Sequence, residues 1–120
     1  MREAIRLQPD FAGAYTTLAT VLREKGDQAG AAEAARSAAR ITKEKTDLQA
    51  ATFATNEGKR FLQLGSIDQA IAQFQIAIRA DAKFAPAHYH LGVALQRKGD
   101  QKSADTAFTR AAELDPRFRR

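Results

Sequence analysis

The sequence has no cysteine and only three prolines among its 120 residues. The absence of cysteine excludes disulfides, thiolate nucleophiles, and zinc or iron sites built on cysteine. No window holds the 18 or more uncharged apolar residues that a transmembrane helix needs, since the longest uncharged stretch, 84–96, includes two histidines. The first residues lack the apolar core of a signal peptide. A cytoplasmic location is therefore the default expectation, and the compartment itself stays open.

The sequence is rich in alanine and has no segment with the alternating polar and apolar residues of a strand. Alanine is the strongest helix former, and its small side chain lets helices approach closely. An all-helical protein is therefore expected. The net charge is +5, and much of it comes from a basic tail at 117–120. We expect this tail to be solvated and frayed.

Three near-copies of one pattern follow each other along the chain. Gly26, Gly65 and Gly99 each end an apolar helical stretch, and they are 39 and 34 residues apart. Each glycine suits the left-handed conformation that ends a helix, and the next residue can cap the following helix. Ser66 with Gln69 also resembles a capping box. The expected helices are 2–8, 11–25, 28–42, 47–64, 67–80, 85–98 and 101–114.

These residues resemble the tetratricopeptide repeat family, in which an aromatic, Leu-Gly, an aromatic, Ala, Phe and Pro recur over 34 residues. The third repeat shows the pattern best, with His88, Leu91, Gly92, Leu95, Ala104, Phe108 and Pro116. The second repeat has Ala54, Glu57, Gly58, Phe61, Ala70 and Phe74, and the first has Tyr15, Leu18, Ala19, Leu22, Ala31 and Ala35. Two departures are Glu57 in place of Leu and Lys43 in place of the closing Pro.

The resemblance implies a right-handed α-solenoid of antiparallel helix hairpins, with three repeats preceded by a half repeat. We expect a single domain over 1–120, with the half repeat at 1–9 and repeats at about 11–45, 47–82 and 85–116. Gly58 and Gly92 lie inside helices, where glycine costs about 0.8–1 kcal/mol relative to alanine. We expect them to face Ala70 and Ala104 at close helix crossings, with Phe74 and Phe108 filling the space toward the following repeat.

In proteins of this family, the first helices of successive repeats line a concave groove that holds a peptide of a partner. The sequence therefore predicts a protein-interaction scaffold. The expected groove residues are Thr16, Thr17, Thr20, Thr55, Asn56, Lys59, Tyr89, His90, Val93 and Arg97. Tyr89 and His90 suit anchors, and Lys59 and Arg97 suit acidic side chains of the partner.

Family members that grip a C-terminal carboxylate use a set of Lys, Asn and Arg in this groove. The corresponding positions here hold Thr16, Thr20, Asn56, Pro86 and His90. Only Asn56 fits that set, so this specificity is not expected.

The main alternative is electrostatic binding of nucleic acid or an acidic partner through Lys59, Arg60, Arg97, Lys98, Lys102 and the tail. Catalysis is not expected, because no nucleophile, base and stabiliser converge in the pattern. No cofactor is expected. A metal site is not expected either, since His88 and His90 are two residues apart and point in nearly opposite directions on a helix.

The sequence leaves the partner, the pathway and the oligomeric state open. The first residues resemble the second half of a helix that ends at Pro9, which indicates a piece of a longer repeat array. We expect Ile5 and Leu7 at the start to have open apolar surface on one side, and Ala107, Ala111 and Leu114 at the end to be partly uncovered. We therefore expect self-association through the uncapped ends.

Overall fold

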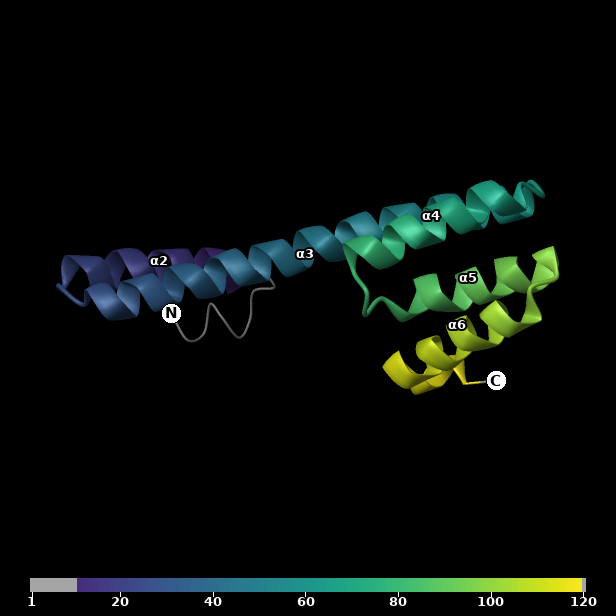
Figure 1. The fold of residues 1–120 in the computed structure, drawn as a ribbon. Coiled ribbons are helices and arrows are strands. Elements are labelled where there is room, and N and C mark those ends of the chain that lie inside the picture. Colours follow the sequence, from purple (N-terminus) through teal and green to yellow (C-terminus); the bar gives the residue numbers. More distant parts are fainter. Residues whose placement is uncertain (1–10, 120) are drawn as a thin grey trace. The chain divides into compact units, whose positions relative to one another are not determined.

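The computed structural model describes residues 11–119, and these form five α-helices and one 3-10 turn. The helices are α2 (Phe11–Glu24), α3 (Gln28–Gln63), α4 (Ile67–Ala80), α5 (Ala85–Lys98) and α6 (Gln101–Leu114), followed by η1 (Pro116–Phe118) (Figure 1). Residues 11–119 contain no strand. The fold is all-α, as in a helical-repeat solenoid. The predicted helix 2–8 and half repeat 1–9 lie outside the described residues.

Short glycine turns connect the paired helices. Gly26, Gly65 and Gly99 have φ values of +85°, +81° and +97°, the left-handed conformation in which glycine is favoured. Asp100 caps α6, since its side chain accepts a hydrogen bond of 3.2 Å from the amide of Ser103. These features confirm the helix ends that the sequence predicted.

The Asp27 side chain accepts a hydrogen bond of 2.9 Å from the amide of Gly30, as expected of a capping residue. Ser66 behaves differently, because its side chain makes no capping hydrogen bond to α4. The capping box expected for Ser66 and Gln69 is therefore wrong.

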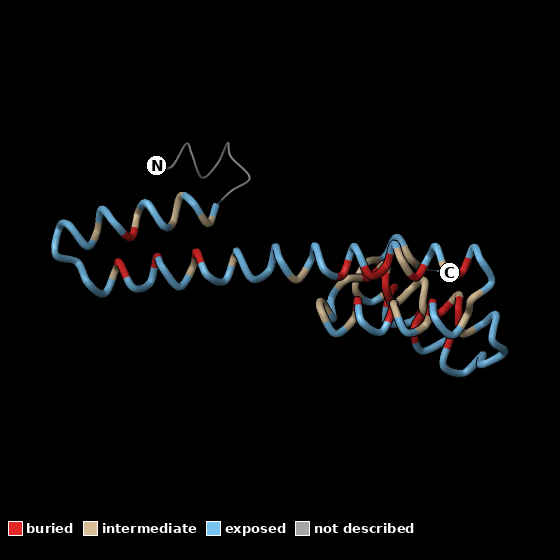
Figure 2. The backbone as a smooth tube through the Cα atoms, turned by 90° about the horizontal axis from the view of Figure 1, so that it is seen from above, coloured by how far each residue is buried: buried red, intermediate tan, exposed pale blue. Residues whose placement is uncertain are grey.

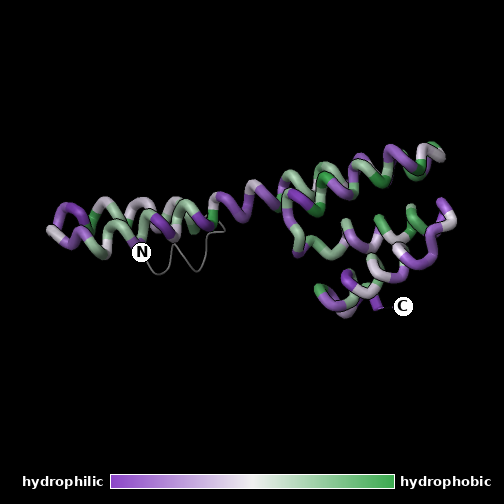
Figure 3. The backbone as a smooth tube through the Cα atoms, viewed as in Figure 1, coloured by the Kyte–Doolittle hydropathy of each residue, from purple (hydrophilic) through white to green (hydrophobic). Residues whose placement is uncertain are grey.

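One unbroken helix, α3, replaces the two helices predicted at 28–42 and 47–64. No glycine or proline occurs between residues 31 and 57, so nothing in this stretch interrupts the backbone hydrogen bonds of a helix. Lys43 stands where the repeat pattern has its closing proline, and the middle of α3 is hydrophilic (Figure 3). The expected break at 42–47 is wrong, because local helix propensity continues across it.

The residues divide into two compact units, one ending at Thr46 and the other beginning at Asp47. The prediction of a single domain with repeats at 11–45, 47–82 and 85–116 stays a prediction. In the first unit, α2 pairs with the N-terminal part of α3, and its buried residues are all alanines: Ala19, Ala31, Ala34 and Ala38. Small side chains allow the two helices of this hairpin to approach closely, and little apolar side-chain volume is buried between them.

The second unit has a larger core, where buried residues gather between the C-terminal part of α3, α4 and α5 (Figure 2). One cluster joins Ala51, Ala54, Ala77 and Ala87, and the other joins Leu62, Ala70, Phe74 and Ala94. Helix α6 then packs along α5. This core fixes α3 and α5 beside each other, which positions the groove described below.

The two mid-helix glycines of this unit lie against phenylalanine rings. The ring of Phe74 lies directly beside Gly58, and Phe108 lies beside Gly92 in the same way. Phe74 is fully buried. Glycine is therefore required by the aromatic ring of the second helix in each hairpin. The atoms nearest to a Cβ at these glycines belong to the two rings and not to the expected Ala70 or Ala104. Phe74 also reaches the following repeat, as predicted, since it packs with Ala94 and stacks on His90 of α5.

The C-terminal residues are ordered against the last hairpin. Asp115 caps η1 by accepting a hydrogen bond from the amide of Arg117, and the Phe118 ring lies 5.3 Å from that of Tyr89. The expectation of a frayed tail at 117–120 is wrong for residues 117–119. Ala107 and Ala111 are also buried, so their predicted exposure is wrong. Ile5 and Leu7 lie outside the described residues.

Candidate partner-binding groove

The groove lies between the C-terminal part of α3 and α5, the first helices of two successive hairpins. Leu62 of α3 and Ala94 of α5 belong to the same core cluster, which holds the two helices together. The guanidinium of Arg97 also donates a hydrogen bond of 3.3 Å to the carbonyl of Leu62. Because this carbonyl is in the last turn of α3, Arg97 partly satisfies a helix end as well as facing the groove.

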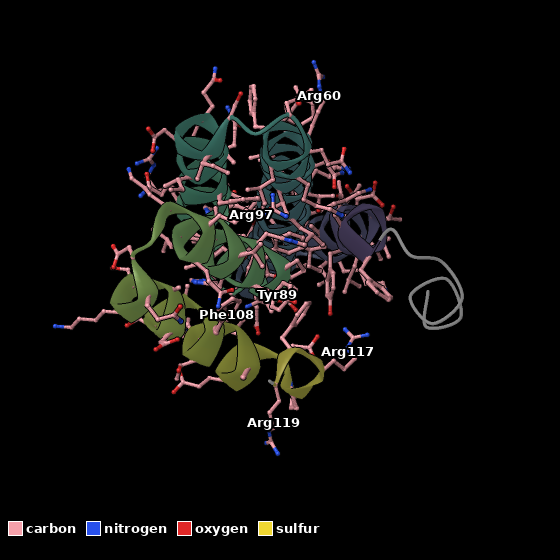
Figure 4. All side chains as sticks on the ribbon, turned by 90° about the vertical axis from the view of Figure 1, so that its right-hand side faces the viewer. Arg60, Tyr89, Arg97, Phe108, Arg117 and Arg119 are labelled. Atoms are coloured by element: carbon pink, nitrogen blue, oxygen red, sulfur yellow. The ribbon has the colours of Figure 1, made fainter. Side chains whose placement is uncertain are left out.

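A cavity of about 270 Å³ opens at this place. Its lining residues are Lys59, Leu62, Gln63, Tyr89, His90, Val93 and Arg97. Tyr89 and Arg97 both come from α5, whereas Arg60 extends from the far side of α3 (Figure 4). The cavity thus combines apolar walls, two aromatic or imidazole rings and two cationic side chains.

Aromatic contacts fix the orientation of the two central rings. The His90 ring stacks on Phe74 with centroids 5.9 Å apart, and Tyr89 meets it edge-on at 5.3 Å. Tyr89 also lies 5.5 Å from Phe108. Rings held on several sides lose little further freedom when a ligand binds. Tyr89 and His90 are therefore pre-organised for contact.

The environment of the cavity keeps His90 neutral near pH 7. Burial lowers the pKa of His90 below 6.5, and the positive charge of Lys59 lowers this pKa further. Lys59 is exposed, and within residues 11–119 it forms no ion pair. Its ammonium group is thus available to an anionic group of a ligand.

Five of the residues predicted for the groove line this cavity: Lys59, Tyr89, His90, Val93 and Arg97. Asn56 is exposed on α3 but is not among the lining residues. Thr16, Thr17 and Thr20 are exposed on α2, in the first unit. Their hydroxyls donate to carbonyls four residues earlier in the same helix.

Thr55 differs from its prediction. Only 3% of this residue is exposed, and its hydroxyl has no hydrogen-bond partner among the described residues. It continues the buried stripe of Ala51, Gly58 and Leu62 at helical spacing. The expectation that Thr55 lies on the open groove face is therefore wrong, because the contact of α3 with its neighbours is wider than the repeat pattern indicates.

Sequence reasoning missed Leu62 and Phe118. Leu62 is 7% exposed yet contributes both its side chain to the cavity wall and its carbonyl to Arg97. Phe118 packs against Tyr89 from the C-terminal turn η1. An apolar residue in a charged tail, at Phe118, was the available signal of packing.

A larger cavity of about 530 Å³ lies elsewhere in the second unit, between α5 and α6 with Ile78 of α4. A cavity of about 300 Å³ occupies the equivalent place in the first unit. Residues Tyr15, Leu18, Leu22, Gly30, Glu33, Ala34 and Ser37 each have a counterpart 73 residues later in the larger cavity. Gly26 and Gly99 are separated by the same interval. Both cavities are therefore the furrow between the two helices of a hairpin.

His88 lines the larger cavity, and its Nε2 contacts the carbonyl oxygen of Ala82 at 2.9 Å. His90 lies in the groove instead, so the two histidines are directed to different places. Within the described part of the chain, no group of three or more potential metal ligands occurs. No helix in residues 11–119 is long and apolar enough to cross a membrane.

Family models agree with the repeats seen in the structure. Models described as tetratricopeptide repeat match residues 1–45 and 85–118, and one described as TPR repeat matches residues 58–99. A comparison with curated proteins finds no match. The matches cover both units and include the helices that form the groove.

Proposed function

The chain belongs to the tetratricopeptide repeat family, whose repeats generally mediate protein–protein interactions, and from this premise we propose that it binds a partner protein in its groove. The bound element is a peptide segment of that partner, held between the C-terminal part of α3 and α5. Family members are typically non-enzymatic. We propose no catalytic role and no cofactor.

One observation carries this proposal: the cavity in the groove presents both rings and cations from two successive hairpins. Tyr89 and His90 supply rigid contact area, and Lys59 and Arg97 supply charge. Interface hot spots are enriched in such aromatic and arginine residues. The repeat spacing together with the family resemblance predicted these residues, and their common location supports the proposal.

Capture of partners from a lysate of the source organism tests the proposal. Tyr89→Ala removes the central ring, and Gln63→Trp blocks the exposed edge of the cavity without disturbing the core. Both should lose a partner that the unchanged chain retains. Leu48→Ala is the matched control, because Leu48 is a 46% exposed apolar side chain on α3 outside the cavity. Far-ultraviolet circular dichroism should show equal helix content in all four proteins.

Retention of the partner by both groove variants would overturn the proposal. Loss with the Leu48 variant alone would place the interface on another face of α3. In each case the amount of captured partner is compared with the amount that the unchanged chain captures from the same lysate.

Binding of nucleic acid is less favoured by the structure. Three of the cations expected to form a basic surface are paired: Arg60 with Glu57 at 3.5 Å, Lys98 with Asp68 at 2.7 Å and Arg117 with Asp115 at 2.7 Å. Paired cations contribute less to a positive surface. If nucleic acid were the partner, affinity would fall steeply with salt and would not depend on Tyr89.

Self-association is a second proposal, supported by exposed apolar side chains in the second unit. Phe53 and Leu64 are 68% and 67% exposed, and Ile76 is 43% exposed. Phe53 and Leu64 are eleven residues apart, which places them on one side of α3 and its end. Light scattering over a concentration series should show a dimer that Phe53→Glu makes monomeric. A strict monomer at all concentrations would overturn it.

A further inference from the structure

The charge of the groove cavity has one sign. Lys59 and Arg97 are cationic, and the other lining residues are uncharged or, for His90, neutral near pH 7. The lining contains no aspartate or glutamate. We propose, on the basis of the function proposed above, that this cavity receives the side-chain carboxylate of an aspartate or glutamate in the partner peptide.

The two cations differ in their contacts, because within the described part of the chain Arg97 is held by a hydrogen bond and Lys59 is not. Both can still contact a carboxylate. Arg97 spends one N–H on the carbonyl of Leu62, and this contact anchors the side chain at the cavity. A guanidinium has five N–H donors, so others remain for a carboxylate. Lys59 forms no ion pair among residues 11–119, and its positive charge acts on His90 across the cavity. A carboxylate between them gains two charge-assisted contacts.

The remaining walls suit the short apolar stem of an acidic side chain. Leu62 and Val93 supply aliphatic surface, and the Tyr89 ring closes one side. The cavity of about 270 Å³ has room for such a side chain. A basic side chain would meet Lys59 and Arg97 as like charges, so the same site rejects lysine and arginine.

Neighbouring cations do not offer an equivalent site. Arg60, next to Lys59 in the sequence, extends from the far side of α3 (Figure 4) and pairs with Glu57 at 3.5 Å. Lys98, next to Arg97, pairs with Asp68 at 2.7 Å. Each groove cation therefore has an adjacent cation that is already compensated, and this provides matched controls.

The test uses a small probe so that it does not depend on identifying the partner. N-acetyl-glutamate N-methylamide carries the proposed carboxylate, and N-acetyl-glutamine N-methylamide has the same shape without the charge. Each is titrated into the full chain, and the backbone amide signals of Gln63, His90 and Val93 are followed by NMR. The glutamate probe should shift these signals in a saturable way, and the glutamine probe should bind at least about fivefold more weakly.

Variants assign the effect to the cavity. Lys59→Gln should weaken binding of the glutamate probe by about fivefold, whereas Arg60→Gln should leave it unchanged. Both changes remove one exposed cation from adjacent positions of α3, so their effect on net charge is the same. High salt should weaken binding by the unchanged chain and have less effect on the Lys59 variant.

Equal binding of the two probes, no saturable shift at these amides, or equal weakening by the Lys59 and Arg60 variants would each overturn the carboxylate assignment. Such a result would not contradict the proposed binding of a partner in the groove, which the capture experiment tests independently. A partner lost with Tyr89→Ala but retained by Lys59→Gln would show that the groove binds a peptide of different chemistry.

Discussion

Phe108 occupies the space beside Gly92 that a side chain at that position would need. A Cβ atom at residue 92 would lie 2.8 Å from Cδ1 of Phe108, closer than two carbon atoms can approach without movement. The ring itself is 6% exposed and cannot move outward freely. Gly58 and Phe74 repeat the arrangement one hairpin earlier. These two pairs explain why the last two hairpins keep a glycine inside the first helix, whereas the first hairpin has Ala19 there and Ala35 in place of the phenylalanine.

We expect Gly92→Ala to lower the free energy of unfolding by about 1–3 kcal/mol, although alanine is the better helix former. Gly92→Leu should cost about 2 kcal/mol or more. Chemical denaturation measures both. In a Phe108→Leu background the cost of Gly92→Ala should fall, because the methyl group then meets a smaller, more flexible side chain. Equal costs in the two backgrounds would contradict the contact.

Thr55→Val should stabilise the protein by about 1 kcal/mol. The two side chains have the same shape, and valine removes a buried hydroxyl that has no partner among residues 11–119. Thr52→Val is the control, since the exposed Thr52 hydroxyl donates to the carbonyl of Leu48 at 2.8 Å. Thermal melts of the two variants make the comparison. A less stable Thr55 variant would mean that the hydroxyl is satisfied in solution.

The titration of His90 should make the second unit less stable in mild acid. Its pKa is lowered by burial and by Lys59, so below about pH 6.5 the unfolded chain binds more protons than the folded chain. Stability therefore falls as the pH decreases from 6.5 toward the folded pKa. NMR titration of the ring should show Lys59→Gln raising this pKa part of the way, because burial is the larger cause. An unchanged pKa in that variant would remove Lys59 from the explanation.

The C-terminal turn should contribute to stability through Phe118. Phe118→Ala removes a ring that lies 5.3 Å from Tyr89, and we expect a loss of about 1–2 kcal/mol in the free energy of unfolding. Arg119→Ala changes the next, exposed residue and should have little effect. Urea denaturation compares the two. Equal stabilities would support the frayed tail that the sequence indicated.

Local sequence determined most helix boundaries. Helices α4, α5 and α6 begin and end where the pattern placed them, because the signals that end a helix act within a few residues. Gly65 and Gly99 adopt the left-handed conformation, and no neighbouring atom lies within 4 Å of where a Cβ would be at either position, so packing around them does not impose it. The repeat spacing also predicts that Tyr89, His90 and Arg97 share one face of their helix, and all three line the groove cavity.

Tertiary packing determined which residues of a predicted face are buried and which distant segments are in contact. Repeat spacing gives the direction in which a side chain points, but burial depends on how far a neighbouring helix extends around it, and this placed Thr55 inside. The Phe118 contact joins the tail to a helix far away in sequence, so no local pattern contains it. Packing also determined the hydrogen bond of Arg97, because its guanidinium reaches the carbonyl of Leu62 only when α3 and α5 lie side by side.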